Sequence, residues 1–178
     1  SNNSCCTLII VIDTSLPSAL DPNYYAVHMQ NTITSVKHAI NVLAAHTAAH
    51  TVRNFFFALV TVDTTLAAEH GSNSDDTCFE IAVPLKELNL NTAHTELSKI
   101  QTKAEVRAQI LAANPKLVSG DNSSTSSKAL EACLSKCAHM LNQQKRKEDQ
   151  ALESAYKKAS QEKITTIAMF SHSESNFY

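Results

Sequence analysis

Glycine is scarce in this chain, and its scarcity excludes several kinds of phosphate-binding enzyme. The 178 residues include two glycines, where average usage of about 7% would give roughly a dozen. Gly71 and Gly120 stand far apart, so the sequence holds no G-x-G-x-x-G turn, no Walker-A loop and no G-x-S-x-G nucleophile elbow, each of which needs paired glycines. Enzymes that depend on those loops are excluded.

Long apolar runs and an excess of charge are also missing. The longest aliphatic run, residues 8–12, is too short for a signal-peptide core or a membrane span. A net charge of −2 indicates neither nucleic acid nor an acidic membrane as a partner. The five cysteines contain no C-x-x-C pair, which favours free thiols in a reducing compartment. A 43% hydrophobic chain of this length fits one domain, residues 1–178, with a real core.

Hydrophobic periodicity predicts seven elements along the chain. The predicted strands are residues 7–12, 55–62, an edge strand at 78–83 that ends at Pro84, and 164–170. The predicted helices are residues 26–51, 96–113, and a third that begins at 126 or 127 and ends near 144. The order β-α-β-β-α-α-β predicts an α/β fold: a doubly wound, mainly parallel sheet with helices on both faces.

Two features at the end of the chain stand out. Residues 145–163 are dense in charge and are interpreted as a solvated helix extension or a mobile loop within the domain. Strand 164–170 comes close to the last residue, so the sheet is expected to lack its last strands and to end in a bare parallel edge. We therefore expect a fragment of a longer protein, or an edge that a partner covers.

Packing explains most of the residues that could suggest chemistry. Cys133 and Cys137 share a helix face at i, i+4, whereas His139 points elsewhere, so both thiols are expected in the core rather than around a metal ion. Tyr24 and Tyr25 are also expected to pack. The helix at 96–113 is expected to direct one stripe inward: Leu97, Ile100, Ala104, Ile110 and Leu111. No catalytic residue is assigned.

One polar sequence lies where α/β sheets bind ligands. Asp13, Thr14 and Ser15 follow the first strand, at the carboxyl edge of the predicted sheet. A carboxylate and a hydroxyl at i+2 are oxygen ligands of the kind that hard divalent cations prefer. The i+4 position is Pro17, which has no side-chain oxygen, so the site is incomplete.

Asp13 and Ser15 resemble the start of the D-x-S-x-S cation site of von Willebrand factor A domains. That family takes a further ligand from a threonine before a later helix, for which Thr125 is the candidate, and an aspartate after the fourth strand. Ser171-His172-Ser173 occupies the latter place in this chain. Asp13, Ser15 and Thr125 are therefore interpreted as vestigial positions, and no bound metal or other cofactor is expected.

Four blocks of the sequence resemble a narrower family, the smaller von Willebrand A subunit (subunit four) of the general transcription and DNA repair factor TFIIH. The blocks are TLIIVIDTSLPSAL, NTITSVKHAINVLAAHTAAHTVRNFFFALV, NSSTSSKALEACLSKCAHMLNQQKRK, and the charged run before ITTIAMFSHSES. The opening block resembles that family's first strand, whose D-x-N-P sequence already departs from the cation motif.

This resemblance implies a non-catalytic, nuclear subunit of the TFIIH core that acts in transcription initiation by RNA polymerase II and in nucleotide excision repair. Its partner would be the RING-containing subunit together with other core subunits, without direct binding of nucleic acid or membrane. The family's zinc module would lie outside this chain. Two alternatives remain: the von Willebrand A ubiquitin receptor of the proteasome, which typically lacks the charged insertion, and a cation-dependent binding or enzyme domain that uses Asp13 and Ser15.

Overall fold

The structure, a computed structural model, describes residues 5–16, 22–49, 54–63, 79–114, 123–155 and 163–171. The elements in these ranges are β1 (Cys5–Asp13), α1 (Pro22–Ala48), β2 (Asn54–Val62), β3 (Phe79–Glu87), α3 (Leu90–Ala113), α4 (Ser123–Ala155) and β4 (Lys163–Phe170). Their order is the one that the sequence predicts. The α/β class and the mainly parallel sheet are confirmed.

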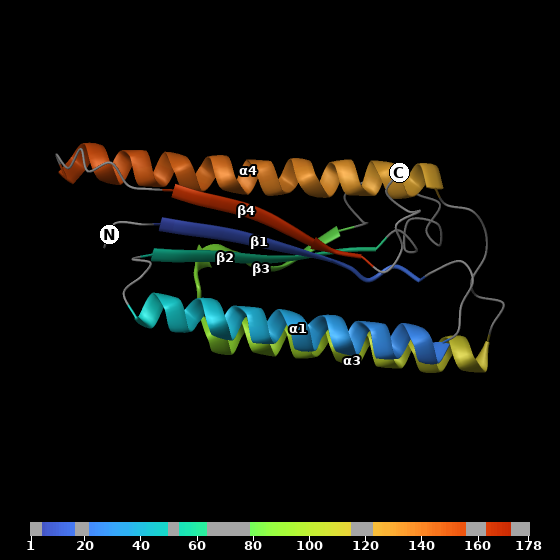
Figure 1. Cartoon of the computed structure of the whole chain (residues 1–178). Helices are drawn as coiled ribbons and strands as arrows, with labels where there is room; N and C mark the ends of the chain where they lie inside the picture. Colours follow the sequence, from blue (N-terminus) through green and yellow to red (C-terminus); the bar gives the residue numbers. More distant parts are fainter. Residues whose placement is uncertain are drawn as a thin grey trace.

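The sheet places β1 in its interior. The strand order is β3-β2-β1-β4, with β1 parallel to β2 and β4, and β3 antiparallel to β2 (Figure 1). A strand that is covered on both faces needs a continuous apolar run rather than an alternating one. This is why Ile9, Ile10, Val11 and Ile12 are all buried. The parallel strands all end at the same edge, where Asp13 follows the apolar run of β1.

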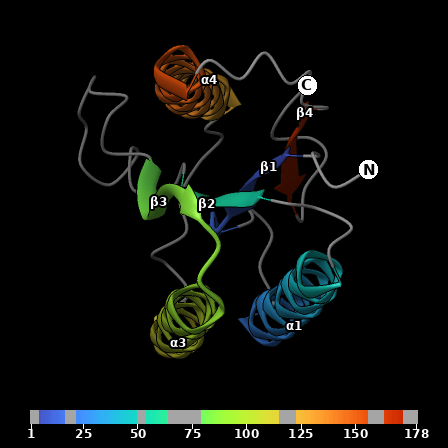
Figure 2. The same cartoon turned by 90° about the vertical axis from the view of Figure 1, so that its left-hand side faces the viewer.

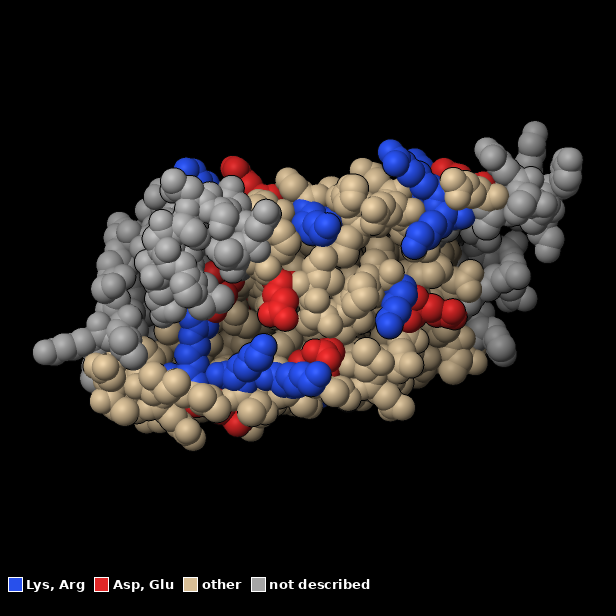
Figure 3. Space-filling model, turned by 180° about the vertical axis from the view of Figure 1, so that it is seen from behind, with Lys and Arg blue, Asp and Glu red and all other residues tan. Residues whose placement is uncertain are grey.

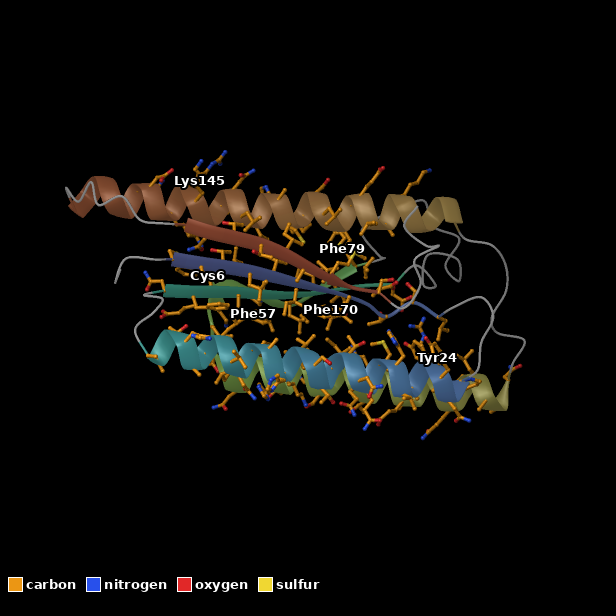
Figure 4. All side chains as sticks on the ribbon, in the orientation of Figure 1. Cys6, Tyr24, Phe57, Phe79, Lys145 and Phe170 are labelled. Atoms are coloured by element: carbon orange, nitrogen blue, oxygen red, sulfur yellow. The ribbon has the colours of Figure 1, made fainter. Side chains whose placement is uncertain are left out.

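Helices cover the sheet in two layers. Helices α1 and α3 lie side by side against one face, and α4 lies against the other (Figure 2). Successive side chains of a strand point to opposite faces of the sheet, so alternate residues pack against the α1 and α3 layer and against α4. Phe57 and Phe170 point toward the α1 side and Phe79 toward the α4 side (Figure 4). Among the described residues, no helix is long and apolar enough to cross a membrane.

Proline and cap residues explain where several elements differ from the predicted bounds. Helix α1 begins at Pro22, earlier than the predicted start at residue 26, because a proline in the first turn has no N–H to leave unpaired. Helix α3 begins at Leu90, earlier than expected, because the Asn89 side chain accepts a hydrogen bond from Thr92 N at 3.1 Å and caps it. Asn114 ends α3 as predicted.

Strand β3 runs through Pro84 instead of ending there. The pairing with β2 shifts register near this point, between Phe57 and Leu59 and again between Leu59 and Val60. A shifted edge strand tolerates proline, because no ladder hydrogen bond is required of it there. The prediction of an edge strand is confirmed, and the strand pairs antiparallel to β2, but the predicted stop at Pro84 is wrong.

Burial separates the packing predictions into correct and incorrect ones. Cys133 and Cys137 are buried, as expected, and His139 is exposed. Tyr25 is buried, but Tyr24 is exposed and its ring stacks on His28. Ile110 is 52% exposed, so the inward stripe of α3 does not include it.

Helix α4 continues through Ala155. Residues 156–162 of the charged run 145–163 lie outside the described residues.

Candidate functional site

Asp13 lies at the carboxyl end of the central strand, with its side chain enclosed by the protein. The residue is 2% exposed, and Ser15 beside it is also buried. One carboxylate oxygen, Oδ1, accepts a hydrogen bond from Ser15 N at 2.9 Å, and Oδ2 accepts one from Ser171 Oγ at 3.2 Å. Ser171 follows β4, so this contact joins the ends of two neighbouring parallel strands. Both oxygens of the carboxylate therefore meet donors from the chain itself.

The backbone of Thr14 connects this strand end to the helical layer. Its N–H donates to the Val62 carbonyl at 2.9 Å and extends the contact between β1 and β2. Its carbonyl accepts from the Tyr25 hydroxyl at 2.9 Å and from Arg107 Nη1 at 3.0 Å. A carbonyl oxygen has two lone pairs, and here one donor from α1 and one from α3 occupy them. The loop after β1 is thereby tied to both helices.

Arg107 also forms an ion pair with Asp63, directly after β2. Nη1 of Arg107 donates to Oδ2 of Asp63. Burial disfavours the charged guanidinium, but the Asp63 carboxylate outweighs that effect, and the pKa of Arg107 is raised. Asp63 and Arg107 are each largely shielded from solvent. A permanent cation of the protein thus lies at the same sheet edge as Asp13.

Burial also changes the acidity of the tyrosine at this edge. Removal from solvent raises the pKa of Tyr25 from 10.0 to about 12, although the positive charge of Arg107 works in the opposite direction. A phenol with so high a pKa stays protonated at neutral pH and serves as a hydrogen-bond donor. This agrees with its contact to the carbonyl of Thr14.

A cavity of about 200 Å³ opens beside these residues, between α3 and the end of the sheet. Arg107, Asp63 and Tyr25 contribute polar lining, and Ile100, Ala82 and Phe79 contribute apolar lining. Its remaining charged residues are Glu80, Glu96, Lys99 and Lys103. Lys99 pairs with Glu96 at 2.8 Å. The cavity therefore combines an apolar wall with charged groups of both signs.

Of the predicted cation-site positions, the structure brings together Asp13 and Ser15. Thr125 falls in the first turn of α4, which begins at the same end of the sheet (Figure 1), but its side chain lies outside the described residues. Pro17, His172 and Ser173 lie outside them as well. Within the described ranges, no group of three or more His, Cys, Asp or Glu side chains could hold a metal ion.

Sequence reasoning missed Asp63 and Arg107. Asp63 had a usable signal, because it directly follows a buried parallel strand, as Asp13 does. Arg107 had none, since 44 residues separate it from Asp63 and its helix could have faced either way. Ser171 was noted as a substitute for an aspartate, but its hydrogen bond to Asp13 was not foreseen.

Comparison of the chain with protein-family models, with curated proteins and with solved structures finds no match.

Proposed function

We propose that this chain is a non-catalytic protein-interaction domain of the von Willebrand factor A type, and that it is the smaller von Willebrand A subunit of the TFIIH core. In this role it would bind the RING-containing subunit and act in transcription and nucleotide excision repair in the nucleus. The order β3-β2-β1-β4 supports the fold, because it matches four consecutive strands of the doubly wound order 3-2-1-4-5-6.

The observation that carries the proposal is how Asp13 is bonded. In a working cation site, the first aspartate would share a metal ion with hydroxyl and carboxylate ligands from other loops. Here Ser15 N and Ser171 Oγ donate to the two carboxylate oxygens. A serine that donates to Asp13 stands where the family has a ligating aspartate. The edge is then held by internal contacts, and the exposed helix faces are left for partner binding.

A titration with Mg²⁺ or Mn²⁺ tests the absence of a cation role. A bound ion stabilises the folded state by mass action, so the melting temperature would rise with ion concentration. We expect no rise that depends on Asp13. Asp13→Asn is the variant to compare, because it keeps the size of the side chain and one oxygen, replaces the other oxygen by an amide nitrogen, and removes the charge. A rise that Asp13→Asn abolishes would favour the cation-dependent alternative and contradict the proposal.

Co-expression tests the partner. The chain is expected to co-purify with the RING-containing subunit of the TFIIH core through size-exclusion chromatography. Isolated von Willebrand A domains from unrelated proteins serve as controls for non-specific capture. A chain that stays monomeric and does not bind that subunit at micromolar concentration would contradict the proposed role.

A further inference from the structure

One flank of α3 carries cationic and apolar side chains in a single exposed stripe. Lys99, Lys103, Val106 and Ile110 follow one another at spacings of four, three and four residues, which places them on one side of a helix. All four are exposed; Val106 is 49% and Ile110 52% exposed. Because the inward face of α3 is occupied by Leu97, Ala104 and other buried residues, the stripe is not needed for the core.

The cationic half of this stripe borders the cavity beside the sheet. Lys99 and Lys103 belong both to the stripe and to the lining of the cavity. Figure 3 shows this side of the molecule, where Lys and Arg side chains border a hollow and acidic side chains face them. The stripe therefore continues from a charged cavity onto two exposed apolar side chains.

Among the described residues, the charges of the cavity leave one cation, Lys103, and one anion, Glu80, unpaired. Arg107 pairs with Asp63, and Lys99 pairs with Glu96. Within the described residues, Lys103 has no ion pair or hydrogen bond, and Glu80 on the β3 wall has none either. The three cations and three anions that line the cavity balance. A polyanion such as nucleic acid would find no excess positive charge here, whereas a single carboxylate can approach Lys103.

We propose that this stripe, Lys99, Lys103, Val106 and Ile110, docks a peptide segment of a protein partner that presents one acidic residue beside apolar residues. The acidic side chain pairs with Lys103 at the mouth of the cavity, and the neighbouring apolar side chains cover Val106 and Ile110. A free small carboxylate would use Lys103 alone and would leave both apolar residues in water. This inference rests on the proposed role as an interaction domain and specifies the chemistry of the partner.

The test uses the full chain and a fluorescein-labelled peptide with one glutamate flanked by leucines. A second peptide has lysine in place of the glutamate. Fluorescence anisotropy is expected to show tighter binding of the glutamate peptide, with affinity that falls as salt rises. Amide resonances of α3 and of residues 79–82 are expected to shift on its addition. Equal binding of the two peptides, or shifts confined to other elements, would overturn the inference.

Variants at exposed positions make the test specific, because such changes rarely affect folding. Lys103→Glu is expected to weaken binding of the glutamate peptide by about tenfold, and Ile110→Ser by about fivefold through loss of apolar contact. Lys128→Glu on α4 makes the same charge change on the opposite layer and is expected to leave binding unchanged. An equal loss of affinity for the glutamate peptide in Lys103→Glu and Lys128→Glu would mean that only the net charge of the protein matters, and it would refute the site.

The two proposals can fail separately. If the RING-containing subunit co-purifies with the chain and the glutamate peptide does not bind at α3, the TFIIH role stands and the α3 docking site is wrong. If the peptide binds at α3 and the RING-containing subunit does not bind, the docking site stands and the TFIIH role is wrong.

Discussion

Arg107 and Asp63 form an ion pair that joins α3 to the end of β2 at the carboxyl edge of the sheet. The same guanidinium nitrogen also donates to the carbonyl of Thr14, after β1. One side chain thus holds the ends of two parallel strands and the helix that packs against them. In doubly wound folds this edge is where ligands bind, and here a cation of the protein itself occupies part of it.

Removing Arg107 is expected to destabilise the fold. Arg107→Leu would leave Asp63 as a buried carboxylate without its cation, at a cost of about 3 kcal/mol in the free energy of unfolding. Urea denaturation monitored by circular dichroism measures the change in the free energy of unfolding.

The paired variant is the control for that measurement. Arg107→Leu combined with Asp63→Leu removes both charges and is expected to recover much of the lost stability, since no uncompensated charge stays buried. If the double variant is less stable than Arg107→Leu alone, the ion pair is not the cause of the loss.

Stability at high pH is expected to depend on Tyr25. Its pKa rises from 10.0 to about 12 on folding, so the unfolded chain releases this proton first. The stabilisation is complete below pH 10 and is lost as the pH rises through 12, by about 3 kcal/mol in total. Urea denaturation across this range should show a steeper decline for the native chain than for Tyr25→Phe. Identical slopes would contradict the burial of an un-ionised phenol.

Two isoleucines of α3 provide a matched test of the helix orientation. Ile100 is 8% exposed and packs in the core, whereas Ile110 is 52% exposed. Ile100→Ala is expected to cost about 3 kcal/mol through lost burial and the cavity that remains, and Ile110→Ala less than about 0.5 kcal/mol. Thermal or urea denaturation of both variants gives the comparison. A large loss at Ile110 would mean that α3 is rotated from the orientation described here.

Local patterns were sufficient to predict the elements of this fold. The continuous apolar run of β1 predicted a strand buried on both faces, and the helical spacing in α1 predicted a helix with one buried face. Each pattern records which faces of the element are turned away from water. The stop at Pro84 failed because its effect depends on the neighbouring strand. Proline breaks a paired ladder, but β3 is an edge strand whose register shifts beside β2.

The candidate site could be predicted in part for a similar reason. Asp13 and Ser15 were recognised because they follow a buried strand and lie two residues apart. Their surroundings were not, because Ser171 and Arg107 reach this edge from elements far along the chain. Ile110 was assigned to the core because helical spacing alone does not distinguish the border of an apolar stripe from its centre.

By itself, the sequence determined the α/β class, the order of the elements and the absence of glycine-rich phosphate loops. These follow from local periodicity and composition, which need no knowledge of distant contacts. The tertiary structure alone decided that Ser171 donates to Asp13, that Arg107 pairs with Asp63, and that Lys103 lies beside the exposed Val106 and Ile110 next to a cavity. Those relationships depend on how α3 is rotated against the sheet and on which strands are neighbours, and long-range packing determines both.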